Sequence, residues 1–282
     1  MSSLRECIVI GGRASGGHVL GKTRDRNYSP RLKVIRVLSP DGIEIVLLYD
    51  LDTHYMEGMN SEGIGIVNAA LLVTDDEKAT KKYWGRTKKK GTSNDGPRIF
   101  RALSCPKLSQ AIKSLVGYDS GLKGHTLVGN PTSLYSIEMT SKHNPIIDKL
   151  DPDAGFNVRT NHGETHTNAG YDPNTQPEDY LSSKIRKATA QSTLADLDDH
   201  EELMPAITVQ NFKKDSNYNM RRTTDNMRTS SQTMMHLDKL QFICYLFPEE
   251  CKFMGMEDRT PSDYEPKISV NIKKYKKPRS ET

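Results

Sequence analysis

An N-terminal segment from Cys7 to Tyr28 constrains the fold more than any other part of the sequence, because it predicts a complete β-hairpin. Residues 7–10 form an apolar, β-branched run, glycines then mark a tight reversal, and residues 18–21 form the returning strand. Residues 22–26 carry four charges in five positions at the end of that second strand. Antiparallel pairing brings these charges beside Cys7, and neighbouring cations favour the thiolate form of a cysteine. The alternative is a free cysteine buried in a core strand, which is the commonest environment for one.

Composition excludes several classes of protein. The chain has 282 residues, 35% of them hydrophobic, and these are gathered into distinct runs, so we expect a packed core with long polar loops. No apolar run approaches the roughly 18 residues of a membrane span, and the first six residues are too short and polar for a secretory signal. We therefore expect a cytoplasmic protein without a membrane partner. The four cysteines, at positions 7, 105, 244 and 251, show no metal-ligand spacing, and there is no GxGxxG or Walker loop, so we expect no metal and no cofactor.

Turn residues and hydrophobic periodicity divide the chain into strands and helices. Strand pairs joined by short turns are predicted within residues 32–51, 126–139 and 229–247. Helical spacing runs from residue 99 to residue 117, with a break at Pro106. A second helix is predicted from residue 184 to residue 194, with Ser182 and Ser183 as its caps. We expect these elements to form a single domain over residues 7–266.

Two segments concentrate positive charge. Residues 75–98 contain eight Lys or Arg against four acids, and Trp84, the only tryptophan, lies in their middle. A charge run of this kind is usually a solvated surface loop. The alternative is a lid over the site, in which Trp84 contacts the substrate. Residues 267–282 form a basic C-terminal tail that begins with a predicted strand. This tail would permit a nucleic-acid partner, and a homo-oligomer also stays open.

Five short motifs, taken in sequence order, resemble those of the cysteine N-terminal-nucleophile (Ntn) hydrolases. This family includes penicillin V acylase, choloylglycine hydrolase, acid ceramidase and the acyl-coenzyme A:6-aminopenicillanic acid acyltransferases. The first motif is Cys7 with its hairpin and the segment GKTRD at residues 21–25. The other four are GMNSEGIGIVNAAL at 58–71, NVRTNH at 157–162, SSKIR at 182–186 and a late hairpin that begins at Thr229. Together they span most of residues 7–247.

The resemblance implies an α+β fold, a four-layer αββα sandwich in which two antiparallel sheets lie between helical layers. It also implies autocatalytic removal of residues 1–6, after which Cys7 becomes the N-terminal residue and the nucleophile. The free α-amino group, with a pKa near 8, would act as general base. The substrate would be a small molecule with a linear amide bond or an acyl group, and water or an amine would resolve the acyl-enzyme.

The resemblance assigns roles to individual residues. Asp25 would orient the new amino group, and Asn68 and Asn161 would stabilise the oxyanion of the tetrahedral intermediate. For Asn68 the simpler alternative is an ordinary strand-end Asn that caps a turn.

The cationic role in the site stays open between two residues. The family usually has arginine where this chain has Lys22, and Arg24 follows two positions later. Either would tune the thiolate together with Arg186. Two other classes of function also stay open. One is a binding or structural protein on the same scaffold that has lost its activity. The other is a papain-like thiol hydrolase, unprocessed, in which His162 deprotonates Cys7. Otherwise His162 would orient its neighbours.

Overall fold

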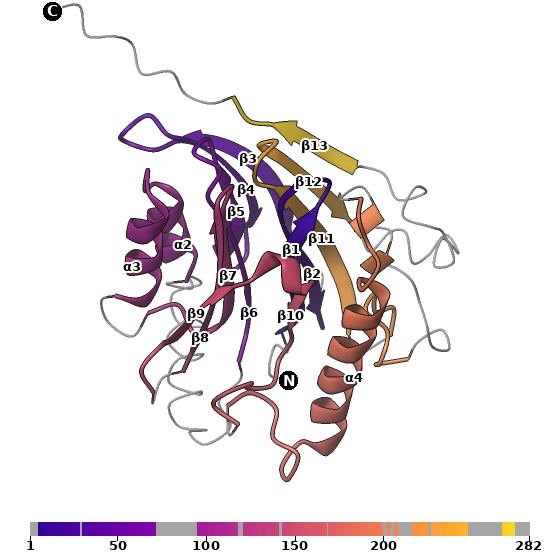
Figure 1. Cartoon of the computed structure of the whole chain (residues 1–282). Helices are drawn as coiled ribbons and strands as arrows, with labels where there is room; N and C mark the ends of the chain where they lie inside the picture. The colour runs from indigo at the N-terminus through magenta and orange to yellow at the C-terminus, as the bar shows by residue number, and fades with distance from the viewer. Residues whose placement is uncertain are drawn as a thin grey trace, which may run out of the picture.

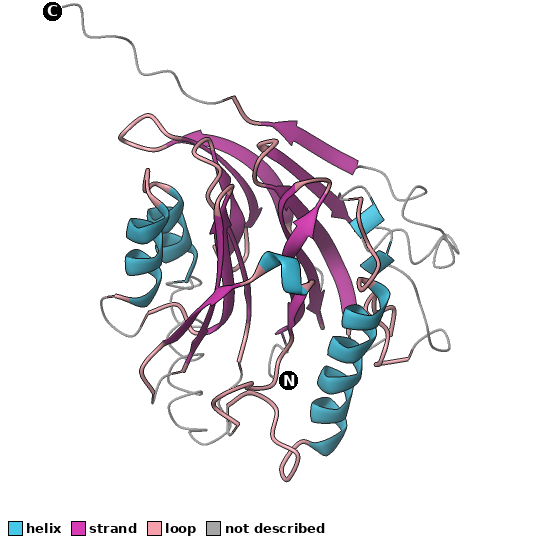
Figure 2. Ribbon diagram, viewed as in Figure 1, coloured by secondary structure: helices cyan, strands magenta, loops and turns pink. Residues whose placement is uncertain are grey.

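The computed structural model describes residues 5–28, 30–71, 95–117, 121–140, 143–167, 169–199, 202–203, 206–207, 216–224, 227–247 and 267–273. Two antiparallel β-sheets pack face to face, and helices cover the outer face of each sheet (Figures 1 and 2). The predicted α+β architecture, a four-layer αββα sandwich, is therefore confirmed.

The first sheet carries the N-terminal hairpin at its centre. Its six strands are, in spatial order, β10 (Asn157–Arg159), β1 (Arg5–Ala14), β2 (Gly17–Arg26), β11 (Arg228–His236), β12 (Gln241–Leu246) and β13 (Lys267–Asn271). The predicted late hairpin is present as β11 and β12, and the predicted last strand is present as β13.

The second sheet is a meander in which every strand pairs with its neighbour in sequence. Its seven strands are, in spatial order, β3 (Leu32–Leu38), β4 (Glu44–Asp50), β5 (Met56–Asn60), β6 (Gly65–Ala69), β7 (Gly124–Asn130), β8 (Ser133–Met139) and β9 (Ile146–Leu150). The predicted strand pairs at 32–51 and 126–139 are confirmed as β3–β4 and β7–β8.

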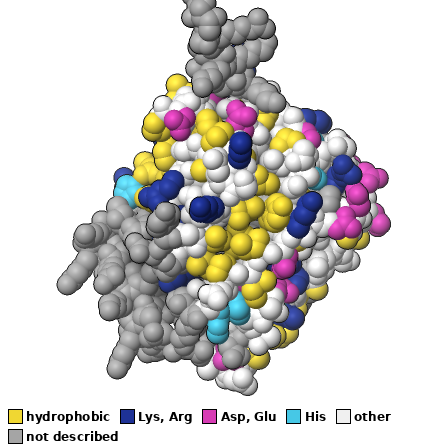
Figure 3. All heavy atoms as spheres, turned by 60° about the vertical axis from the view of Figure 1, so that its left-hand side comes forward, with side chains coloured by type: hydrophobic (Ala, Val, Ile, Leu, Met, Phe, Trp, Pro, Cys, Tyr) yellow, Lys and Arg dark blue, Asp and Glu magenta, His cyan; other side chains and the backbone are white. Residues whose placement is uncertain are grey.

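The helices form the outer layers. Helices α2 (Asp95–Leu103) and α3 (Leu108–Val116) pack their apolar sides on the second sheet, and α4 (Pro177–Thr193) packs on the first. The break at Pro106 falls between α2 and α3, as predicted. Figure 3 turns the α2 and α3 side of the molecule forward, and hydrophobic side chains gather at the centre of this described surface. A single turn of 3₁₀ helix, η1 (Pro152–Ala154), precedes β10.

Side chains of β1 alternate between the two faces of the first sheet. Cys7 and Val9 point between the sheets and belong to the same apolar cluster as Leu20 of β2. Ile8 and Ile10 point the other way and pack on the α4 side. Both faces of the strand are therefore buried, which explains the continuous apolar run at its start.

A two-residue turn, Ser15–Gly16, joins β1 to β2. Both residues have positive φ, 49° and 74°, which is the type I′ geometry that matches the twist of a hairpin. The predicted reversal began at Gly11 and Gly12, and this is wrong, because both lie inside β1. The register pairs Cys7 with Arg24, so the prediction that the hairpin brings the charged segment beside Cys7 is confirmed. That segment is part of β2.

Two predicted helix boundaries are wrong. Helix α2 begins four residues earlier than its apolar spacing indicated, so residues 95–98 of the basic segment are helical. Helix α4 begins at Pro177, where a fixed φ suits the first turn, so residues 182–183 lie inside the helix and do not cap it. Residues 5–6 of the predicted propeptide form the start of β1 in the unprocessed chain, and their removal stays a prediction.

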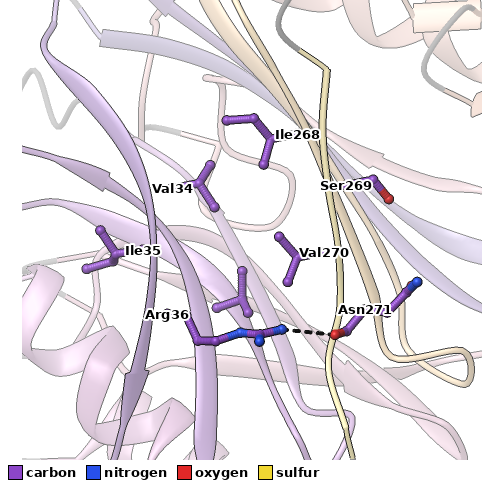
Figure 4. Close-up of a pocket in the computed structure, with 8 residues that line it drawn as sticks. Val34, Ile35, Arg36, Ile268, Ser269, Val270 and Asn271 are labelled. Atoms are coloured by element: carbon purple, nitrogen blue, oxygen red, sulfur yellow. Dashed lines mark hydrogen bonds between the residues drawn. The ribbon is translucent and has the colours of Figure 1, made fainter.

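The edge strands of the two sheets approach each other at one side of the sandwich (Figure 4). Arg36 of β3 donates a hydrogen bond from Nη2 to the backbone oxygen of Asn271 in β13 at 3.0 Å. An open groove of about 430 Å³ lies at this edge, and Val34, Ile268 and Val270 are among the residues that line it. Its lining contains none of the predicted site residues that the structure describes, so the candidate site lies elsewhere.

Candidate active site

Cys7 is the third residue of β1 and is 2% exposed. Its backbone N–H donates a hydrogen bond to Oδ1 of Asn161 at 3.1 Å. Its sulfur lies 3.7 Å from Nη1 of Arg26, at the end of β2. Within the described part of the chain, this guanidinium is the polar group that contacts the thiol.

Arg26 contacts more than the sulfur. The same Nη1 atom donates to the backbone oxygen of Glu6 at 3.3 Å and to that of Asp25 at 2.5 Å. The oxygen of Glu6 is the carbonyl of the Glu6–Cys7 peptide bond, so one nitrogen contacts both the thiol and the carbonyl that precedes it. Burial disfavours the charged guanidinium, but the charges of Cys7, Tyr28 and Asp50 and the hydrogen bond to Cys7 together outweigh burial and raise the pKa of Arg26 above its usual value. Arg26 was not among the predicted residues, although strand alternation places it on the same face as Cys7.

The two predicted cations, Lys22 and Arg24, also lie between the sheets. Each pairs with a buried carboxylate of the opposite sheet: Lys22 with Glu57 and Arg24 with Asp50. Lys22 Nζ also donates to the Tyr55 hydroxyl at 3.2 Å. Burial lowers the pKa of Lys22 below its usual value, although Glu57 and the nearby thiolate raise it. The structure thus brings both cations near the thiol but gives each its own counter-ion.

A second charged cluster lies on the opposite face of the first sheet, under α4. Arg186 Nη2 is 2.6 Å from Glu6 Oε2, and its Nη1 is 3.4 Å from Asp25 Oδ2. Arg222 Nη1 lies 2.9 Å from the same Glu6 oxygen. All four side chains are at most 2% exposed.

The pKa values of the two carboxylates of this cluster are shifted in opposite directions. Burial favours the neutral acid at both. At Glu6 the neighbouring Arg222 and Arg186 outweigh burial and lower the pKa. At Asp25 burial outweighs the same two cations and raises the pKa. Glu6 is therefore the principal counter-ion of the two arginines. The predicted residues Asp25 and Arg186 are brought together, with Glu6 between them and Cys7.

Asn161 is the predicted residue that reaches Cys7 directly. Its Oδ1 accepts from the Cys7 N–H and, at 3.3 Å, from Arg186 Nη2. Its Nδ2 donates to the backbone oxygen of Ala70 at 2.9 Å, and its own N–H donates to Ser183 Oγ at 2.9 Å. Since both neighbours of Oδ1 are donors, the network fixes the orientation of the amide. As placed here, Asn161 orients the nitrogen of Cys7, and its Nδ2 is occupied by Ala70.

Asn68 is a predicted oxyanion donor that the structure does not bring to the thiol. Its neighbour Val67 packs between the sheets in the same cluster as Cys7, so strand alternation turns Asn68 to the other face of β6. There its Nδ2 donates to Thr126 Oγ1 at 2.9 Å and to the backbone oxygen of Lys123 at 3.2 Å. Asn68 therefore contributes hydrogen bonds to the start of β7 in this arrangement.

The ring of His162 is buried among groups other than the thiol. Its Nδ1 lies 2.8 Å from Ser183 Oγ and 3.1 Å from Thr160 Oγ1. Its Nε2 lies 3.4 Å from Glu164 Oε1, and its ring meets that of Tyr180 edge-on at 5.7 Å. The partners of both ring nitrogens thus belong to the segment around Asn161 or to α4, and these contacts hold that segment against the helix.

Other parts of the site were not predictable or are not described. Trp84 and residues 75–94 of the basic segment lie outside the described residues, so the lid stays a prediction. Glu6 and Arg222 were missed: Glu6 was expected to be cut away, and the polar stretch around Arg222 shows no periodicity. Among the residues that the structure describes, no group of three or more His, Cys, Asp or Glu side chains could hold a metal ion. No helix in the described ranges is long and apolar enough to cross a membrane.

Comparisons with known proteins bear on the fold. No family model and no curated protein sequence matches the chain. Among solved structures, it is similar to a Caenorhabditis elegans ortholog of N-acylethanolamine-hydrolysing acid amidase, with a TM-score of 0.60 and 14% identity over 82% of this chain and 93% of that one. A mutant of conjugated bile acid hydrolase from Clostridium perfringens gives a TM-score of 0.48 and 10% identity, over 95% and 97% of the two chains. Penicillin V acylase from Agrobacterium tumefaciens gives 0.46 and 11%, over 86% and 84%. From the first similarity and the two-sheet architecture, the chain has the sandwich fold of the Ntn hydrolases.

Proposed function

We propose that this chain is a cysteine Ntn hydrolase or acyltransferase that cleaves a linear amide bond through an acyl-enzyme on Cys7. One observation carries the proposal: a single arginine nitrogen contacts both the Cys7 sulfur and the carbonyl oxygen of the preceding peptide bond. The thiol, a cation for its thiolate and a donor for the developing oxyanion are thereby gathered at one bond. The structurally similar nematode protein is an ortholog of N-acylethanolamine-hydrolysing acid amidase, and N-acylethanolamines are linear amides.

The first step is self-cleavage before Cys7. The Cys7 thiolate attacks the carbonyl carbon of Glu6, and Arg26 stabilises the negative charge on the oxygen. The C–N bond then breaks, the nitrogen of Cys7 takes up a proton, and Glu6 is held as a thioester on the sulfur. Water hydrolyses this thioester, which releases residues 1–6 with a free carboxyl group and leaves a thiol and a free amino group on Cys7.

The second step uses the new amino group. With a pKa near 8, it takes the proton of the thiol at neutral pH. The thiolate attacks the substrate amide, the protonated amino group returns the proton to the leaving amine, and water or a second amine resolves the thioester. Asn161 Oδ1, which already accepts from the Cys7 nitrogen, holds that amino group in place, and Arg26 donates to the substrate oxyanion.

Intact-mass spectrometry of the freshly purified protein tests this proposal, together with a thiol-directed acylating probe. We expect the mass of residues 7–282 and a single acyl adduct that maps to Cys7. A Cys7→Ala chain, as the matched control, should keep its full length and take up no acyl group.

Other outcomes would reject the proposal in distinct ways. A wild-type chain that keeps its first six residues and still turns over amides would exclude the N-terminal amine as base and favour the thiol hydrolase without processing. A chain that keeps them and takes up no acyl group would favour the scaffold without activity.

A further inference from the structure

The side chain of Glu6 fills a buried, cationic pocket beside the bond that is to be cut. Its Oε2 lies 2.6 Å from Arg186 Nη2 and 2.9 Å from Arg222 Nη1. The Glu6 side chain is 2% exposed, and the Tyr171 side chain, buried beside it, has its pKa raised by burial and by the Glu6 charge. The pocket thus holds one carboxylate between two guanidinium groups.

Removal of residues 1–6 takes this carboxylate away. The arginines then face Asp25, whose pKa burial raises, as their remaining acid within the cluster described here. Leaving a buried guanidinium without its counter-ion is strongly unfavourable. The processed protein therefore has a pocket that binds an anion, at a position defined by the residue that has left.

The position of this anion relative to the reacting carbonyl follows from covalent structure. In Glu6, the carboxyl carbon is separated from the carbonyl carbon that Cys7 attacks by the α, β and γ carbons. An amide substrate that places its own carbonyl at the same point would reach the two arginines with a carboxylate at the end of the same five-carbon chain.

We propose that the mature enzyme acts on amides whose acyl group is a five-carbon dicarboxylic acid, that is, glutaryl or α-glutamyl amides, and that Arg186 and Arg222 bind the distal carboxylate. This inference rests on the proposed function, because it takes the acyl group of the self-cleavage step as the template for the substrate. Bidentate or paired guanidinium contacts of this kind select a carboxylate over a neutral group of equal size.

The chemistry of the substrate reaction is that of the self-cleavage. The thiolate attacks the amide carbonyl of the glutaryl group, the C–N bond breaks and the amine leaves with a proton from the Cys7 ammonium. Water then hydrolyses the glutaryl thioester, which releases glutarate and restores the thiol.

Two matched substrates test the proposal on the self-processed wild-type protein. Glutaryl 4-nitroanilide and pentanoyl 4-nitroanilide have the same chain length and differ in the terminal carboxylate. We expect kcat/KM to be about 100-fold higher for the glutaryl compound, because the carboxylate makes two charge-assisted contacts. Arg222→Met should reduce this ratio to near 1, and Arg222→Lys should retain part of it.

A neighbouring arginine provides the control for the substitution. Arg221 lies over the ring of Phe247, 5.2 Å from its centroid, so Arg221→Met should leave the ratio unchanged. A wild type that hydrolyses both anilides at equal kcat/KM would overturn the carboxylate subsite and leave the amidase function standing.

A binding measurement tests the pocket without any turnover. In a full-length Cys7→Ala chain, the further change Glu6→Ala removes the acetate portion of the side chain and leaves the two arginines in place. Acetate should raise the melting temperature of this double variant but not of the Cys7→Ala parent, and acetamide should raise neither. If acetate acts equally on both chains, or if acetamide matches it, the pocket does not select a carboxylate. If acetate selects the double variant but no amide is turned over, the pocket is upheld and the amidase function is the part that fails.

Discussion

Replacing Arg26 tests the chemical core of the site, because its contacts separate it from the other buried cations. Arg26→Met removes the donor to the Glu6 carbonyl oxygen and the cation 3.7 Å from the sulfur. It leaves no carboxylate without its counter-ion, because the described hydrogen-bond acceptors of Arg26 are backbone oxygens and the thiol. The variant should therefore fold, and the defect should appear in the chemistry.

The magnitude follows from two effects. Loss of one donor to a developing oxyanion lowers a rate by about 10²–10³. Loss of the charge-assisted hydrogen bond to the Cys7 sulfur, about 1.5–3 kcal/mol for a bond of this kind, adds to this effect. Since both effects arise from one guanidinium they are not independent, and we expect self-cleavage to slow by about 10³. Arg26→Lys keeps the charge without the branched geometry and should recover part of the rate.

The assay follows cleavage during synthesis. Chains are made in a cell-free system with an isotope pulse, quenched with acid at intervals, and the cleaved fraction is read by intact-mass spectrometry.

Arg24→Met is the matched comparison. Arg24 is the next residue on the same face of β2 but pairs with Asp50, so its loss leaves a buried carboxylate unpaired. That should cost about 3–5 kcal/mol in the free energy of unfolding, with a smaller effect on cleavage by the folded fraction. Cleavage of Arg26→Met within tenfold of the wild-type rate would refute the role given to Arg26.

Three further predictions address neighbouring groups. Asn161→Ala removes the acceptor of the Cys7 nitrogen and should lower turnover about 10²-fold through misplacement of the nucleophile; near-wild-type turnover at equal melting temperature would contradict this. Cys7→Ala should have a free energy of unfolding within about 1 kcal/mol of that of the wild-type chain, and a much larger loss measured in urea would mean that the thiol itself is structural. Burial lowers the pKa of His125 to about 4, so between pH 6.5 and pH 4 the unfolded state binds more protons than the folded state. The free energy of unfolding should therefore fall by about 3 kcal/mol as the pH is lowered over this range. In urea melts, His125→Gln should reduce this dependence of the free energy of unfolding on pH.

The sequence predicted the fold well where local patterns coincide with tertiary structure. Hairpin turns and apolar alternation placed the strands around 32–51, 126–139 and 229–247, and the approach of the charged segment to Cys7 follows from pairing alone. The boundaries failed where tertiary packing extends an element. Helix α4 begins already at Pro177, and Ser183 lies inside it, where its hydroxyl accepts a hydrogen bond from the backbone N–H of Asn161.

The sequence predicted several residues of the site correctly, but it predicted less well how these residues are arranged. The motifs identified Cys7 and Asn161, which do meet. They could not show that Lys22 and Arg24 are each neutralised by a carboxylate from the other sheet, since Glu57 and Asp50 are far away in sequence and in unrelated segments. A short motif also does not show which face of the sheet each of its side chains lies on, because that depends on the register with the neighbouring strand. For this reason the motif could not show that Asn68 points away from the thiol.

The two-residue turn at Ser15–Gly16 has a consequence for insertions and deletions. The length of this turn fixes the pairing of Cys7 with Arg24, and that register determines on which face of the sheet each side chain of β2 lies. Adding or removing one residue there would exchange the two faces, so that Asp25 would face the thiol and the basic side chains would face α4. We therefore expect this hairpin to vary in evolution by substitution, or by insertion or deletion of two residues at a time. Single-residue insertions across residues 13–18 should abolish self-cleavage more completely than single-residue insertions in the turn at Asp238–Lys239. That second turn joins two strands that carry none of the charged groups around Cys7.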